Sequence, residues 1–162
     1  MIDSDGYVKG LETRLAADGC QVTHEKLGLV GYKAQTRLLM RAHVFLVAAK
    51  ADVVDEDVLS GFAAEAVDLA VARKGQWRGV QSGVIVLPVM VANTAAPGAV
   101  AITQRPHRLN LGGFAVMAQP AVVDLAAGKS HIFRGIRIWG YAFNALIKKK
   151  LALYLPDPGS AR

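Results

Sequence analysis

One short segment restricts the folds open to this chain more than any other. Residues 43–49 are apolar almost throughout and rich in types that favour strands. A strand with no polar side to present to water is expected where a sheet is covered on both faces. Hydrophobic residues make up 52% of the 162 positions, enough to supply that covering. We therefore expect a layered fold around a buried central strand.

Three segments have the apolar spacing of helices. The first covers residues 8–18, with Val8, Leu11 and Leu15 on one face and Gly19 placed to end it. The second begins near Glu56 and ends near Arg73, and Asp52 and Asp55 offer oxygen atoms to cap its start. Its apolar stripe consists of Leu59, Phe62, Ala63, Ala66, Leu69 and Ala70. The third covers residues 137–154, before Pro156 and Pro158.

The remaining apolar segments are short and read as strands. They are residues 20–26, 28–34, 43–49, 83–92, 99–103, 111–118 and 120–125, with a turn at 93–98 and a loop at 104–110. Because proline cannot donate to a strand ladder, Pro88 predicts that strand 83–92 lies at an edge or is bulged there. Consecutive strands early and late in the chain indicate hairpins. We expect a single α/β domain over residues 1–162, with α+β character and helices packed on a central mixed sheet.

Composition and motif spacing argue against several chemistries. The four histidines, His24, His43, His107 and His131, are dispersed, and Cys20 is the only cysteine, so no metal-binding spacing occurs. Ser82 resembles a nucleophile elbow only superficially, because it follows a helix and opens a strand. No glycine-rich phosphate loop is present. We predict no catalytic residues, no metal and no cofactor.

The order of elements up to Lys50 resembles the core of the restriction-endonuclease-like (PD-(D/E)xK) families. In those families a strand ends in an acid-x-lysine step and a helix follows. The resemblance implies that Lys50 would orient an attacking water, with two carboxylates holding magnesium. Ala48 stands where the acid is expected, and the preceding strands offer only Glu25. A nuclease-like enzyme with a degenerate metal site is therefore the alternative function.

The two halves of the chain differ in charge. Eleven of the thirteen carboxylates lie in residues 1–68, whereas twelve of the nineteen Lys and Arg residues follow Asp68. The second half is the natural source of a surface for nucleic acid or another polyanion. The predicted anion-binding residues are Arg105, His107, Arg108, His131, Arg134 and Arg137. Solubilising charges around an apolar chain would give the same pattern.

Together these features favour a small, non-catalytic cytoplasmic binding or assembly module. The N-terminus lacks the order of a secretory signal, and the longest apolar run is ten residues, too short to span a bilayer. Segment 137–154 is apolar around most of its circumference, which predicts a homodimer. A third reading places this helix on a membrane surface. The homodimer and the membrane-surface prediction both rest on the same apolar positions, which are Ile138, Trp139, Tyr141, Ala142, Phe143, Ala145, Leu146, Ile147, Leu151 and Leu153.

Overall fold

A mixed β-sheet forms the centre of the protein. The computed structural model describes residues 2–37, 40–74, 82–105, 107–111, 114–135 and 141–160, and in these the sheet has eight strands. Their spatial order is β1-β2-β3-β4-β6-β5, with β7 also beside β4 and β8 beside β7. The strands are β1 (Gln21–His24), β2 (Leu29–Arg37), β3 (Met40–Val54), β4 (Ser82–Ala95), β5 (His107–Leu111), β6 (Phe114–Ala118), β7 (Ala121–Asp124) and β8 (Lys129–His131).

The pairing confirms the expected mixture of hairpins and parallel strands. Strands β1, β2 and β3 form an antiparallel meander, and β5–β6 and β7–β8 are antiparallel pairs. Between them, β3 runs parallel to β4, and β4 runs parallel to both β6 and β7. The parallel centre is where a strand is expected to be buried on both sides.

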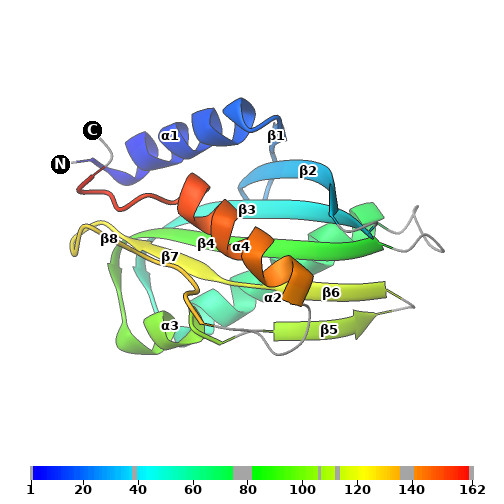
Figure 1. Cartoon of the computed structure of the whole chain (residues 1–162). Coiled ribbons are helices and arrows are strands. Elements are labelled where there is room, and N and C mark those ends of the chain that lie inside the picture. The colour runs from blue at the N-terminus through cyan, green and yellow to red at the C-terminus, as the bar shows by residue number, and fades with distance from the viewer. Residues whose placement is uncertain are drawn as a thin grey trace.

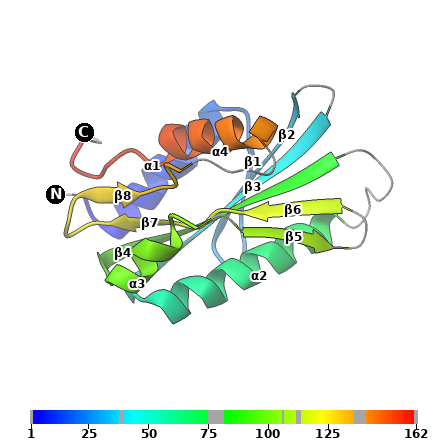
Figure 2. The same cartoon turned by 60° about the horizontal axis from the view of Figure 1, so that its bottom comes forward.

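Helices cover both faces of the sheet (Figures 1 and 2). Figure 2 shows α1 and α4 on one face and α2 on the other, with α3 beside α2. The helices are α1 (Ser4–Ala17), α2 (Glu56–Lys74), α3 (Pro97–Ile102) and α4 (Tyr141–Tyr154). None of the helices in the described residues is long and apolar enough to cross a membrane.

Side chains of β3 alternate between two apolar cores, as the sequence predicted for this strand. Val44, Leu46 and Ala48 belong to the core under α1 and α4, whereas Phe45 and Val47 belong to the core under α2. All five are buried. Alternation follows from the two-residue period of a strand, so β3 contributes to both cores at once.

Pro88 was expected at a sheet edge or at a bulge, and its strand does not lie at an edge. Strand β4 is central, and its partner on one side changes from β6, opposite Val84–Val86, to β7, opposite Val89–Ala92. The carbonyls of Val86 and Ala92 accept hydrogen bonds from the side of β6 and β7. Alternate residues of a strand direct their backbone groups to the same neighbour, so the nitrogen of Pro88 faces the gap between β6 and β7. Proline is tolerated there because the ladder is already interrupted.

Two other expectations from the second half were wrong. Residues 99–103 are not a strand, because Pro97 occupies the first turn of α3, where its fixed φ favours a helix. The expected loop at 104–110 contains most of β5, which pairs with β6. Strand β8 was not expected, since its three residues carry no apolar alternation.

Helix α4 buries one stripe of side chains against the sheet. Phe143, Leu146, Ile147 and Leu151 all belong to the core under α1 and α4, while Leu153 is 44% exposed. Residues 136–140, which include the expected start of this helix, lie outside the described residues. The described apolar positions are thus mostly covered within one chain, and the homodimer stays a prediction.

Candidate functional site

The loop after α3 lies against the segment after β8. The side-chain amide of Gln104 donates to the carbonyl of Ile132 at 2.8 Å and to Oγ1 of Thr103 at 3.0 Å. Its oxygen accepts from the backbone nitrogen of Arg134 at 3.4 Å. One glutamine therefore ties two segments that are about 30 positions apart in the sequence.

This bridge brings together two of the predicted anion-binding residues. Arg105 directly follows Gln104 in the chain, and the backbone nitrogen of Arg134 donates to the side-chain oxygen of Gln104. Both arginine side chains are exposed. Guanidinium groups present planar donors that match phosphate oxygens, so two exposed arginines on adjoining segments suit a polyanion.

His131 belongs to the same half but differs in character. It lies on β8 opposite Val122 and is half-buried. Burial lowers the pKa of its imidazole below the usual value, and Lys129 adds to this, although Asp124 and Asp157 act in the opposite direction. His131 is therefore mainly neutral at pH 7 and adds a hydrogen-bonding group rather than a charge. The side chains of His107 and Arg108, and all of Arg137, lie outside the described residues.

Lys50, the residue of the nuclease-like alternative, lies near the end of β3. Its ammonium pairs with the Asp5 carboxylate at the start of α1, and its side chain is 51% exposed. Ala48, in the position of the missing acid, is buried in the core. Within the described residues, no group of three or more His, Cys, Asp or Glu side chains could hold a metal ion. The element order α1-β1-β2-β3-α2 that carries the resemblance is present, but a ligand set for magnesium is not found among these residues.

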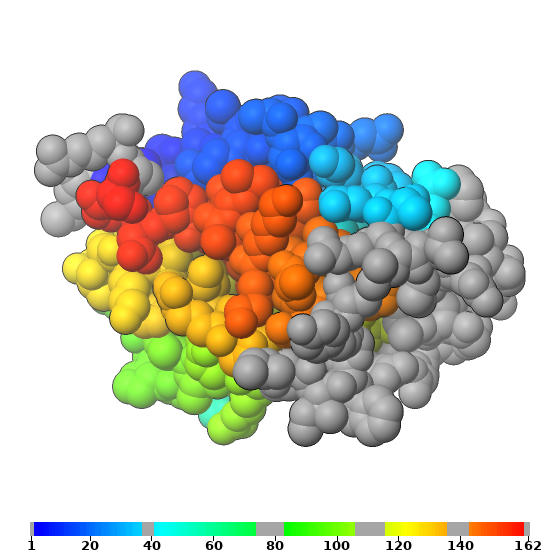
Figure 3. Space-filling model, viewed as in Figure 1, coloured from blue at the N-terminus to red at the C-terminus, as the bar shows by residue number. Residues whose placement is uncertain are grey.

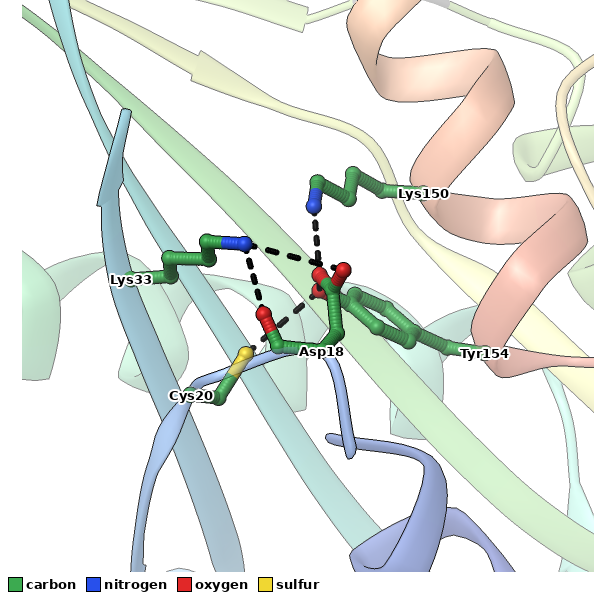
Figure 4. Close-up of polar contacts among 5 residues, drawn as sticks. All are labelled: Asp18, Cys20, Lys33, Lys150 and Tyr154. Atoms are coloured by element: carbon green, nitrogen blue, oxygen red, sulfur yellow. Dashed lines mark hydrogen bonds and ion pairs between the residues drawn. The ribbon is translucent and has the colours of Figure 1, made fainter. Parts of the chain in front are cut away.

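A partly buried polar cluster, which the sequence did not reveal, lies where α1 meets α4 (Figure 4). Asp18 caps the end of α1, and its Oδ2 accepts from Lys150 Nζ at 2.5 Å and from the Tyr154 hydroxyl. Lys33, on β2, donates to the carbonyl of Asp18 at 2.5 Å. Cys20 Sγ lies 3.4 Å from the Tyr154 oxygen. We call these five residues the Asp18 cluster.

The charges in the Asp18 cluster stabilise one another. Burial by itself raises the pKa of the Asp18 carboxyl, but the hydrogen bonds from Lys150 and Tyr154 and the positive charges of Lys150 and Lys33 together outweigh it, so the pKa lies below its usual value. Burial, followed by the bond to Asp18, raises the pKa of the Tyr154 phenol well above its usual value. At neutral pH Asp18 is therefore a carboxylate and Tyr154 a neutral phenol.

The low solvent exposure of Lys150 and Tyr154 favours a structural role for the Asp18 cluster over a catalytic one. The side chain of Lys150 is 5% exposed, and Tyr154 is 1% exposed. A substrate could not reach these two groups without displacing α4. The cluster therefore joins α1, β2 and α4. In the sequence Lys150 ends a run of three lysines, and only its spacing of four residues from Leu146 and three from Ile147 places it on the buried stripe of α4.

Comparison with known proteins gave no matching family model, no similar curated protein and no similar solved structure.

Proposed function

We propose that the protein is a non-catalytic binding module whose basic second half holds a polyanion, with nucleic acid as the first class to test. The observation that carries the proposal is that Arg105 and Arg134 are both exposed on adjoining segments, since Gln104, the neighbour of Arg105, accepts from the backbone nitrogen of Arg134. The charge asymmetry of the sequence supports it, because carboxylates are scarce after Asp68.

The rival functions have less support in the described residues. A nuclease needs carboxylates converging near Lys50, and the one carboxylate paired with Lys50 is Asp5. A membrane-surface role needs an exposed apolar face on α4, whereas Phe143, Leu146, Ile147 and Leu151 are buried. A binding module requires neither feature.

The test is fluorescence anisotropy with a labelled single-stranded DNA of about twenty nucleotides, titrated over a range of salt concentrations. We expect Arg105→Ala combined with Arg134→Ala to weaken binding about tenfold at low salt. The slope of log affinity against log salt should fall by about 1.4, since each neutralised phosphate of a single strand contributes roughly 0.7.

A matched control removes the same charge elsewhere. Lys9 and Lys26 are both exposed and belong to the acid-rich half, so Lys9→Ala combined with Lys26→Ala should change the affinity much less. Equal losses of affinity in the two double variants would mean that binding depends on net charge alone and not on Arg105 and Arg134. Binding that does not respond to salt would contradict the proposal outright.

A further inference from the structure

Gln104 connects two segments of the chain although its own side chain is exposed. Its amide donates to the carbonyl of Ile132 at 2.8 Å and to Oγ1 of Thr103 at 3.0 Å, and its oxygen accepts from the backbone nitrogen of Arg134 at 3.4 Å. Fixing a long, exposed side chain in one conformation costs conformational entropy, which these hydrogen bonds offset. Because none of them involves a charged group, the connection does not depend on salt.

The segment that carries Arg105 is anchored at the end of α3. The backbone nitrogen of Arg105 donates to the carbonyl of Ile102 at 3.0 Å. Thr103 is completely buried, and its Oγ1 donates to the carbonyl of Val100 at 2.6 Å. The carbonyl of Thr103 in turn accepts from Nε2 of the buried Gln119 at 2.8 Å. The backbone from which the exposed Arg105 side chain extends is therefore fixed.

The segment that carries Arg134 is anchored by apolar packing. Ile132 and Phe133 are buried in the core under α1 and α4. The chain then passes close to the Phe133 ring, because a Cβ added at Gly135 would lie 3.0 Å from that ring. Arg134, between Phe133 and Gly135, is exposed. Both arginines therefore extend from fixed backbone segments that Gln104 joins.

Two cations on joined segments can hold one strand more firmly than two cations on segments that move independently. Once the first cation has contacted a phosphate, the second contact is intramolecular and benefits from a high effective concentration. We propose that Gln104 is a positioning residue, which keeps the two segments together so that Arg105 and Arg134 contact the same nucleic-acid strand at once. This inference rests on the proposed function, because it concerns the same two arginines.

The experiment compares Gln104→Met with the wild type in the anisotropy titration with labelled single-stranded DNA. Methionine keeps the length of the side chain and the net charge, but it cannot donate to Ile132 or Thr103. We expect the affinity at low salt to fall about threefold, which is part of the roughly tenfold loss expected without both arginines. In the double variant Arg105→Ala with Arg134→Ala, adding Gln104→Met should have no further effect on affinity, because no second contact is left to position.

Two controls separate a positioning role from a merely structural one. Gln21→Met makes the same chemical change at an exposed position on β1 and should leave the affinity unchanged. Urea unfolding should show the same loss of stability from Gln104→Met with and without the two arginines, whereas the loss of affinity should require them. Wild-type affinity in Gln104→Met, or an equal loss of affinity in the arginine double variant, would overturn the positioning role and leave polyanion binding standing. Absence of salt-dependent DNA binding by the wild type would overturn both proposals.

Discussion

The two faces of the sheet are covered in different ways. One face packs against α2, whose apolar stripe includes Leu59, Phe62 and Ala66, together with Ala99 and Ile102 of the short α3. The other packs against α1 and α4, which come from opposite ends of the chain (Figure 3). The α2 face is covered by helices from the middle of the chain, whereas the α1–α4 face exists only when the two ends of the chain meet.

Polar contacts are concentrated where these two ends meet. Besides the Asp18 cluster, the Tyr7 hydroxyl donates to the Pro156 carbonyl at 2.7 Å, and Arg14 Nε donates to the Tyr154 carbonyl at 2.8 Å. Apolar burial is non-directional, so it does not by itself fix how two helices are placed. Hydrogen bonds and ion pairs add that direction, which suggests that the cluster sets the register of α1 against α4.

The largest expected effect is a difference in unfolding free energy between loss of Asp18, at the end of α1, and loss of Asp55, at the start of α2. Asp18→Ala leaves the Lys150 ammonium buried without its partner and should lower the free energy of unfolding by roughly 3–5 kcal/mol. Asp55→Ala removes the cap on Val58 at the start of α2, a bond of 2.8 Å, and should cost about 1 kcal/mol. Urea denaturation of both variants measures the difference. Equal costs would show that the Asp18 cluster contributes no more than an ordinary cap.

Apolar packing should be comparable on the two faces. Leu59 on α2 and Leu146 on α4 are both completely buried, so each Leu→Ala change should cost roughly 3 kcal/mol. Leu153→Ala, at a position 44% exposed, is the control and should change the free energy of unfolding by less than about 0.5 kcal/mol. A much smaller loss for Leu146→Ala than for Leu59→Ala would indicate that α4 is loosely packed.

The contrast between local segments and contacts across the length of the chain also explains which features could be predicted from the sequence. The stripe of α2 and the apolar run of β3 follow simple periods, and both were located within a few residues. Gly19 ends α1 with a positive φ of 86°, as expected. Asp18 and Lys150 are 132 positions apart, and no local period connects them. The bridge from Gln104 to Ile132 and Arg134 is likewise long-range, so only its basic residues were predicted.

The smallest expected effect concerns acid. Because the folded-state pKa of Asp18 lies below its usual value, its ionised form stabilises the protein above the unfolded pKa of about 3.9. This contribution is lost as the pH falls through the folded pKa. The difference in unfolding free energy between the wild type and Asp18→Asn should therefore be constant from about pH 5 to 7 and shrink below about pH 4. The cost of Leu146→Ala, which removes no titratable group, should stay constant over the same range. Thermal or urea unfolding at a series of pH values tests both, and a difference for Asp18→Asn that grows on acidification would show that the carboxylate is not the stabilising form.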